Sequence, residues 1–389
     1  MLFSSTRSCL LLYNEDYLKF DYGPSHPLQV NRLKLTMDLI EAYGLLPPRK
    51  GRLEKTRPAT KEEVLTFHTH DYFRILQEAN SGHSDFDLSA YGLGPGDNPI
   101  FPGILDWACY CAGGALQAGE WVTSGRKRIA FHLAGGMHHA HKNMASGFCY
   151  LNDPVLVILY LLSQGKKVAY IDIDAHHGDG VQEAFYGTNK VLTISFHQNG
   201  TTLFPSTGFV QEIGTGQGVG YAVNVPLYPW TDDEVFSWAF MEVIPPILEA
   251  YAPDVIVTQL GVDTFYNDPL ANLSLTTKGF CRAVNFFKGL NLPWVALGGG
   301  GYHQVNVARA WTLAWSIMVE EELDQKELPH SFQETIRRLD FHEQWLRSED
   351  FQEDSVKKER AFVDARRAVR AIKDTIYPLL NMYGGGQWM

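Results

Sequence analysis

The sequence predicts an α/β protein built on a single open, mostly parallel β-sheet with helices on both faces. Three observations lead to this prediction. Short apolar runs typical of buried strands recur along the chain, and amphipathic segments at helical spacing lie between them. Long glycine-bearing loops follow several of the apolar runs. Buried strands that alternate with helices are typical of a parallel sheet whose two faces the helices cover.

The order of these segments gives the expected elements. We expect strands at the apolar runs 8–13, 128–132, 167–172, 190–197, 221–225, 254–259 and 292–297. We expect helices at the amphipathic segments 30–43, 61–78, 103–119, 154–164, 232–250, 277–288 and 306–321. No proline-rich or glycine/serine-rich linker divides the chain, so one domain over residues 1–389 is expected. Its C-terminal extension, 324–389, is charged over 324–359 and predicted to be helical over 360–380.

The composition limits the classes of protein to which the chain can belong. Of its 389 residues 45% are hydrophobic, which supplies a sizeable core. A net charge of −11 argues against sequence-independent binding to nucleic acid phosphates. The sequence lacks an apolar run of about 18 residues, so no membrane span is expected. Five cysteines without a CxxC pair favour reduced thiols and a cytoplasmic location, with Cys109 and Cys111 in the core.

Three carboxylates and two imidazoles lie within eight residues, directly after the apolar run 167–170. They are Asp172, Asp174, His176, His177 and Asp179. Open parallel sheets place their ligand sites at the carboxyl ends of strands, and buried ionisable groups need a partner or a cation. Asp174 and His176 point to the same side of an extended strand end, and such mixed ligands suit a divalent metal such as zinc. His177 and His141 are expected to be packed or solvated histidines.

A second cluster follows the strand expected at 128–132. Two glycines precede the adjacent histidines His138 and His139, and glycines allow a backbone or a substrate to come close. A carboxylate can orient each imidazole, fix its tautomer and raise its basicity. Asp172 and Asp179 are the spare acids for this purpose.

A third cluster contributes one more carboxylate at a strand end. Asp263 follows the strand expected at 254–258 and can complete a three-ligand set with Asp174 and His176. Two carboxylates would neutralise a divalent cation, and three protein ligands leave the open position that catalytic zinc requires. Asp268, which precedes a proline, has the pattern of a helix cap or turn former.

Four glycines at 298–301 follow the strand expected at 292–297, and Tyr302 comes next. The glycines lack dinucleotide-loop spacing, and no Lys-Ser or Lys-Thr pair follows them, which argues against a phosphate site. Backbone freedom before a tyrosine fits a hydroxyl placed in a crowded site. There it can donate a hydrogen bond to a developing oxyanion.

The four clusters together resemble the histone deacetylase superfamily of the arginase/deacetylase fold, and the resemblance covers nearly the whole chain. The matching segments are GGMHHA (135–140), ASGFCYLND (145–153), YIDIDAHHGDGVQEAFY (170–186), FPSTG (204–208), NVPL (224–227), QLGVDTF (259–265) and LGGGGYH (297–303). The compact chain is similar to the prokaryotic acetoin-utilisation (AcuC-type) branch, which is close to class I deacetylases.

The resemblance implies a zinc-dependent hydrolase that cleaves the amide of Nε-acetyl-lysine to lysine and acetate. It implies one catalytic Zn²⁺ bound by Asp174, His176 and Asp263, in a site that Fe²⁺ can also occupy. The implied substrate is an acetylated protein or peptide, and the AcuC-type branch suggests an acetyl-CoA synthetase. The oligomeric state stays open.

Catalytic roles are implied for five further residues. His139, oriented by Asp179, is implied to be the general base and later the proton donor. His138, paired with Asp172, is implied to act mainly through its charge. Tyr302 is implied to polarise the acetyl carbonyl.

The resemblance also implies residues that bind substrate, product and potassium. The residues implied at the acyl-lysine tunnel and its rim are Asp97, Gly147, Phe148, Phe204, Leu270 and Gly300. An inner channel for acetate is implied beside Arg32. One structural K⁺ site is implied near Asp172, Asp174, His176, Ser195 and Phe196. A second K⁺ site is implied near Phe185, Thr188, Val191 and Tyr221.

Three alternatives to this function remain. A binuclear manganese ureohydrolase would need an Asp-x-Asp pair where position 261 is glycine. An acetylpolyamine amidohydrolase would share the chemistry but would be expected to carry an insertion that narrows the mouth, and none is evident near 16–32. A non-catalytic acyl-lysine or metal-binding module would not need His139, Asp179 and Tyr302 together.

Overall fold

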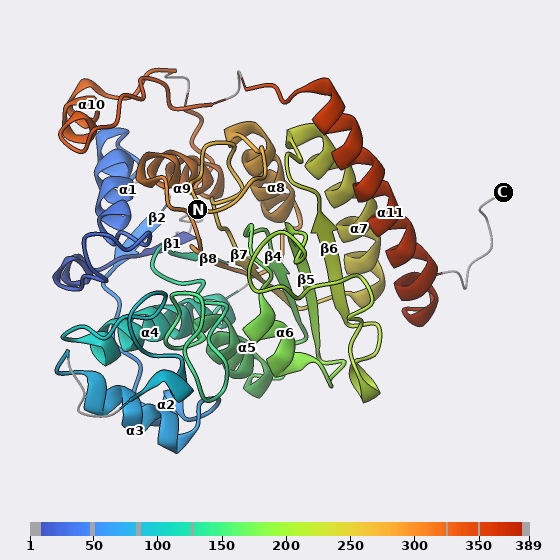
Figure 1. Cartoon of the computed structure of the whole chain (residues 1–389), viewed down its shortest axis with the longest axis horizontal. Helices are drawn as coiled ribbons and strands as arrows, with labels where there is room; N and C mark the ends of the chain where they lie inside the picture. The colour runs from blue at the N-terminus through green and yellow to red at the C-terminus, as the bar shows by residue number, and fades with distance from the viewer. Residues whose placement is uncertain are drawn as a thin grey trace, which may run out of the picture.

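An eight-stranded parallel sheet forms the centre of the molecule in a computed structural model, which describes residues 9–46, 51–82, 87–125, 128–323, 326–348 and 351–382 (Figure 1). The strand order is β2-β1-β3-β8-β7-β4-β5-β6, and each neighbouring pair is parallel. The strands are β1 (Cys9–Leu12), β2 (Gly51–Glu54), β3 (Ile129–His132), β4 (Val168–Asp172), β5 (Val191–Gln198), β6 (Ala222–Leu227), β7 (Val255–Gln259) and β8 (Trp294–Leu297). The predicted open parallel sheet is thereby confirmed.

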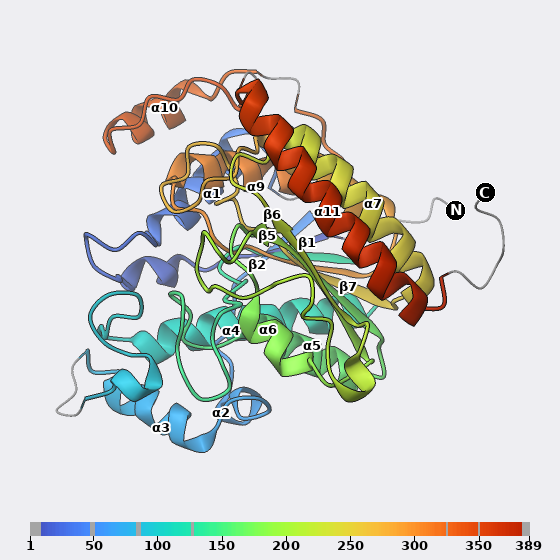
Figure 2. The same ribbon diagram turned by 45° about the vertical axis from the view of Figure 1, so that its right-hand side comes forward.

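Helices cover both faces of this sheet (Figures 1 and 2). One face carries α2 (Lys61–Val64), α3 (His70–Ala79), α4 (Ile104–Thr123), α5 (Asp153–Ser163) and α6 (Asp179–Phe185). The other carries α1 (Asn31–Ala42), α7 (Asp233–Tyr251), α8 (Thr277–Gly289), α9 (Gln304–Met318), α10 (His330–Arg337) and α11 (Ser355–Leu379). Short 3₁₀ helices lie at η1 (Glu15–Lys19), η2 (Ser89–Tyr91) and η3 (Gly216–Gly218).

Alternation along the strands divides the core into two layers. In β1, Leu10 and Leu12 pack in the layer beneath α4 and α5, whereas Cys9 and Leu11 belong to the opposite layer. Successive side chains of a strand point to opposite faces, so strands that are apolar throughout require cover on both sides. The predicted core positions of Cys109 and Cys111 are confirmed, because both thiols are buried.

Several details of the fold differ from the sequence-based expectation, among them the short helices α6 and α10, which were not expected. The single helix expected over 61–78 is wrong, because α2 ends at Val64 and α3 begins at His70. Thr60 and Thr69 each accept a backbone hydrogen bond at a helix start, so the segment contains two N-caps. Strand β2 was not expected, since GRLE is short and polar; as an edge strand it is half exposed.

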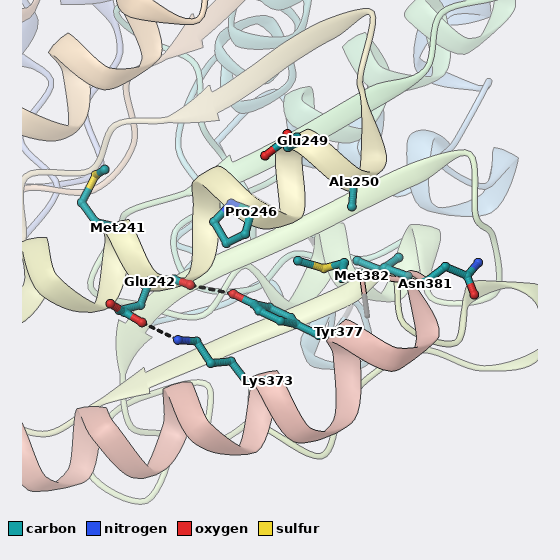
Figure 3. A pocket seen from close by; sticks show the side chains of 10 residues that line it. Met241, Glu242, Pro246, Glu249, Ala250, Lys373, Tyr377, Asn381 and Met382 are labelled. Carbon is teal, nitrogen blue, oxygen red and sulfur yellow. Dashed lines mark hydrogen bonds and ion pairs between the residues drawn. The ribbon is translucent and has the colours of Figure 1, made fainter. Parts of the chain in front are cut away.

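The C-terminal extension contributes α10 and the long helix α11, which lies against α7 and the edge strand β6 (Figure 2). Lys373 forms an ion pair with Glu242, and the Tyr377 hydroxyl donates a 2.6 Å hydrogen bond to the Glu242 carbonyl (Figure 3). These contacts line a surface pocket of about 930 Å³ between the two helices. None of the helices in the described part of the chain is both long and apolar enough to cross a bilayer.

Candidate active site

The four predicted clusters lie side by side because they follow four neighbouring strands. The strand order β3-β8-β7-β4 is the centre of the sheet. Since all strands are parallel, their carboxyl ends share one edge, where open α/β sheets bind ligands. The paired histidines follow β3, the glycine run follows β8, Asp263 follows β7 and the acid-rich segment follows β4.

Asp174, His176 and Asp263 form a buried group whose ligand atoms all lie within 4.8 Å of one another. The Nδ1 atom of His176 lies 3.2 Å from Asp174 Oδ1 and 2.9 Å from Asp263 Oδ2. These three are the residues predicted as metal ligands. Among the described residues, no other group of His, Cys, Asp or Glu side chains meets the same condition.

The chemistry of this group fits a divalent cation. Burial and the neighbouring Asp174 raise the pKa of Asp263 to about 7, so two carboxylates are crowded together without enough positive charge. Burial lowers the pKa of His176, but hydrogen bonds and charges from Asp174 and Asp263 outweigh it and raise the pKa to about 10. A proton therefore binds strongly at the position where a cation bound by one imidazole and two carboxylates would lie.

Glycines leave room for these carboxylates. A Cβ atom at Gly300 would lie 2.2 Å from Asp263 Oδ2, and one at Gly261 would lie 2.2 Å from Asp174 Oδ2. The Gly300 N–H donates a 2.8 Å hydrogen bond to Asp174 Oδ2. Position 261, where a second metal-binding aspartate would be needed, is thus filled by the Asp174 carboxylate itself.

Each of the paired histidines has its own carboxylate. His138 Nδ1 lies 2.7 Å from Asp172 Oδ2, and His139 Nδ1 lies 2.7 Å from Asp179 Oδ1. The two rings are close, with centroids 4.0 Å apart. The surplus of acids indicated Asp172 and Asp179 as partners, the family resemblance implied these two pairs, and the structure brings the residues together in that way.

The two imidazoles have opposite electrostatic environments. Burial would lower the pKa of His138, but the carboxylates of Asp172 and Asp174 raise it to about 9. Burial and the charge of His138 lower the pKa of His139 to about 4, despite its hydrogen bond to Asp179 and the charge of that carboxylate. At neutral pH His138 is therefore charged and His139 is neutral, with its Nε2 atom able to accept a proton.

A narrow cavity of about 20 Å³ lies between Asp174 and the predicted substrate residues Gly147 and Phe148. Its lining includes His138, His139, Gly147, Phe148, Asp174, Gly300 and Tyr302. The ring of Tyr302 packs edge-on against Phe148 at 5.6 Å and against His176 at 6.3 Å between centroids. Burial, with the charges of Asp263 and Asp174, raises the pKa of Tyr302 well above its ordinary value, so its hydroxyl keeps its proton.

The turn that carries Gly147 and Phe148 has an unusual backbone. Both residues have positive φ values, 51° and 69°, and a bulky residue rarely adopts that region. The Tyr22 hydroxyl donates a 2.9 Å hydrogen bond to the Phe148 carbonyl, and a Cβ at Gly147 would lie 2.5 Å from the His139 ring. The turn therefore holds an aromatic ring beside the cavity at a backbone cost of the kind that concentrates at functional sites.

The other predicted substrate residues are not among those that line this cavity. Phe204 is 42% exposed, and its ring packs 5.1 Å from that of His139. Asp97 is exposed, and its carbonyl contacts the ring of His26, which packs against Phe148. Leu270 is half-buried in the loop after β7.

Arg32 lies deeper in the molecule. Its Nη1 atom donates a 2.9 Å hydrogen bond to the carbonyl of Gly301, and its guanidinium lies 5.3 Å from the centroid of the Trp311 ring. Arg32 therefore supports the glycine loop from behind.

The residues of the two predicted potassium sites occupy neighbouring strands. Ser195 and Phe196 lie on β5, and Ser195 is the register partner of Asp172 on β4. The second set lies around the start of β5, at the end of α6 and just before β6. Its members are Phe185, Thr188, Val191 and Tyr221.

Three residues set aside in the sequence reasoning have definite positions. Burial lowers the pKa of His177 to about 4, and this histidine packs as a neutral ring whose Nδ1 bonds to Thr207 Oγ1 at 2.8 Å. His141 contacts Glu183, and its Nε2 atom lies 3.7 Å from Asp179 Oδ2. Asp268 is a turn former, since its Oδ1 accepts a 3.0 Å hydrogen bond from Leu270 N.

Two buried side chains that position the site were missed. The Asp153 carboxylate accepts hydrogen bonds from Gly136 N at 2.9 Å and Met137 N at 2.8 Å and so holds the loop before the paired histidines. Gln259 Nε2 donates a 2.5 Å hydrogen bond to Asp174 Oδ2. Two signals in the sequence could have indicated these residues. Asp153 lies at the start of a helix, and Gln259 lies at the end of a strand.

The comparisons with known proteins agree with this geometry. A family model described as the histone deacetylase domain matches residues 26–318. Histone deacetylase B of Dictyostelium discoideum is 43% identical over 330 residues, which cover 84% of this chain and 77% of that protein. Histone deacetylase RPD3 of Saccharomyces cerevisiae is 39% identical over 330 residues, which cover 84% of this chain and 75% of that protein.

Solved structures give the same result. A crystal structure of an HDAC homolog from Aquifex aeolicus superposes with a TM-score of 0.85 at 36% identity, over 93% of this chain and 100% of that one. A structure of an HDAC homolog complexed with SAHA superposes with a TM-score of 0.86 at 36% identity, over 95% of this chain and 100% of that one.

Proposed function

This chain belongs to the histone deacetylase family, and on that premise we propose that it is a zinc-dependent lysine deacetylase. It hydrolyses the amide of Nε-acetyl-lysine in a protein or peptide, with lysine and acetate as products. The observation that carries the proposal is two adjacent imidazoles, each with its own carboxylate, beside the buried group Asp174, His176 and Asp263.

In this proposal His139 is the residue that accepts and then donates the proton. Its low pKa leaves it neutral and ready to accept a proton from the attacking water, and Asp179 fixes its tautomer through Nδ1. The same imidazole then gives the proton to the leaving lysine amine. His138, held charged by Asp172, stabilises negative charge that develops nearby.

Asp174, His176 and Asp263 would hold the zinc, which when bound polarises the acetyl carbonyl and lowers the pKa of water. Tyr302 donates a hydrogen bond to the carbonyl oxygen as that oxygen gains negative charge. Its raised pKa supports this role, because the hydroxyl stays protonated at neutral pH.

The surroundings of the cavity support a lysine side chain as the substrate stem. Phe148 and Phe204 flank the entrance with Leu270, and the Gly147 carbonyl and Gly300 face the acyl amide in this proposal. Asp97 at the rim binds the substrate backbone, and Arg32 lines the acetate channel. The two predicted K⁺ sites, the AcuC-type placement and an acetyl-CoA synthetase as substrate stay predictions.

A screen of acetate release tests this function. Acetyl-lysine peptides and acetylpolyamines are incubated with chelator-treated protein before and after Zn²⁺ or Fe²⁺ is returned. We expect peptide turnover that the chelator removes and zinc restores. Turnover of acetylpolyamines alone would favour an acetylpolyamine amidohydrolase, and no acetate from either class would overturn the proposal.

Tyr302→Phe tests the catalytic assignment directly. Loss of one hydrogen-bond donor to a developing oxyanion lowers kcat by roughly 10²–10³-fold. The fold should survive, because the Tyr302 hydroxyl has no hydrogen-bond partner in the described part of the chain. Steady-state kinetics and a thermal unfolding curve check both parts, and near-normal kcat would contradict the role of Tyr302.

A further inference from the structure

Asp268 joins its own loop, which also carries Leu270, to the loop of Tyr302 at the cavity. This side chain is only 7% exposed and lies in the loop after β7. Its Oδ2 atom accepts a 2.8 Å hydrogen bond from Tyr302 N and a longer one, 3.4 Å, from His303 N. Its Oδ1 atom accepts a 3.0 Å hydrogen bond from Leu270 N. One carboxylate therefore ties the loop of Leu270 to the loop of Tyr302.

Tyr302 depends on its backbone for its direction. Its hydroxyl has no hydrogen-bond partner among the residues that the structure describes, and its ring is held by packing alone, including edge contacts with Phe148 and His176. The preceding residue, Gly301, has φ +133°, and a glycine can adopt many other backbone conformations. The regular backbone of α9 begins only at Gln304. Asp268 is therefore the side chain that fixes the Tyr302 peptide N–H.

We infer that Asp268 is a positioning residue, which sets the Tyr302 hydroxyl and the Leu270 wall of the tunnel at the same time. The inference rests on the proposed function, in which that hydroxyl meets the acetyl carbonyl. Asparagine at this position has the same size but only one oxygen, so it can accept from one loop and loses its bond to the other. A displacement of about 1 Å at a reacting group can cost on the order of 10²-fold in rate.

A double-mutant cycle tests this role. Asp268→Asn, Tyr302→Phe and the double variant are assayed on an acetyl-lysine peptide at saturating zinc, so that a change in metal affinity does not enter kcat. We expect Asp268→Asn to lower kcat by roughly tenfold or more, with a smaller change in KM. In the Tyr302→Phe background the same substitution should have little further effect on kcat, because the hydroxyl it positions is absent.

Asp254→Asn serves as the matched control. Asp254 precedes β7, at the opposite end of the strand that Asp268 follows, and its carboxylate accepts a 2.8 Å hydrogen bond from Lys167 N. This variant makes the same carboxylate-to-amide change at a group that accepts a backbone hydrogen bond, but far from the cavity, so it should keep the kcat of the parent protein.

Two results would overturn the inference. One is a double variant whose fold-loss in kcat equals the product of the fold-losses of Asp268→Asn and Tyr302→Phe. A general structural defect, independent of the Tyr302 hydroxyl, would give that result. The other is a crystal structure of Asp268→Asn in which the Tyr302 ring keeps its position, and this measurement decides the matter if Tyr302→Phe has no measurable rate. A parent protein that releases no acetate would instead overturn the proposed function, so the two failures are distinguishable.

Discussion

The hydrogen bonds that hold the loop of the paired histidines depend on pH through a buried neutral histidine, His68. His68 Nε2 accepts a 3.0 Å hydrogen bond from Asn152 N, which requires the neutral ring with its proton on Nδ1. The Asn152 side chain in turn donates to the carbonyls of His138 at 3.1 Å and Ala140 at 2.8 Å. Burial lowers the pKa of His68 from 6.5 to about 3, so protonation of His68 opposes this whole arrangement.

The stability of the protein should therefore fall in acid. Between pH 6.5 and about 3 the unfolded chain binds a proton at His68 that the folded chain does not. Through that window the uptake of this proton lowers the free energy of unfolding by about 1.4 kcal/mol for each unit by which the pH falls. Above pH 6.5 His68 has no such effect. His68→Gln should make the fall shallower, as measured by urea unfolding at stepped pH. The exposed His70→Gln is the control, and equal slopes in all three proteins would contradict the assignment.

The sequence could predict which reactive side chains meet but not all the groups that hold them. Asp174, His176 and Asp263 follow strands of one parallel sheet, so residue type and position predicted their proximity. Asp153 and Asp268 act by accepting peptide N–H groups, and such acceptors have no characteristic spacing. Their partners depend on loops whose paths only the folded chain defines.

At the scale of elements, the two edges of the sheet are protected differently. Strand β2 carries the exposed charges of Arg52 and Glu54 at one edge. Strand β6 forms the other edge, and its Pro226 lacks the N–H that a further strand would need there. Helix α11 lies against β6 and α7 (Figure 2), so this edge is covered as well.

Removal of α11 should expose the β6 edge. A chain that ends at residue 354 loses the helix and its ion pair between Lys373 and Glu242. We expect a lower unfolding temperature and self-association, detected as larger species by size-exclusion chromatography with light scattering. A chain that ends at Met382 retains α11 and should elute like the full chain. Identical elution of both truncated chains would contradict a protective role for the helix.

Periodicity predicted most elements and failed where local signals were weak. Seven strands and most helices follow apolar patterns of adequate length, which burial on both sheet faces enforces. Periodicity did not predict strand β2, because its sequence is polar and it becomes a strand through long-range pairing with β1. The break between α2 and α3 reflects capping by Thr69, which competes with the apolar periodicity that continues through the segment.

For the whole molecule, the site geometry predicts one catalytic metal ion per chain. The ligand group offers one imidazole and two carboxylates, and the Asp174 carboxylate fills the space beside Gly261. Zinc at about 100 times its dissociation constant should stabilise the fold by about 2.7 kcal/mol, because it binds the folded chain alone. Elemental analysis and thermal unfolding with and without zinc measure both effects.

The matched variant for this prediction is His176→Ala, which should lose both the bound zinc and the zinc-dependent rise in unfolding temperature. Two equivalents of catalytic metal in the parent protein would instead point to a binuclear hydrolase. A parent protein whose unfolding temperature zinc does not change would contradict binding to the folded chain, and a rise that His176→Ala retains would mean that zinc binds elsewhere.

The strand order also dictates when the chain can acquire its metal during synthesis. β3 and β4 leave the ribosome early, but in the sheet they are separated by β8 and β7, which are made last. Asp263 and Gly300, which complete the pocket around Asp174, arrive only with those two strands. A nascent chain therefore carries half a site until the late strands insert between the early ones. We therefore expect a metal ion that needs all three of Asp174, His176 and Asp263 to bind only after β7 and β8 have joined the sheet.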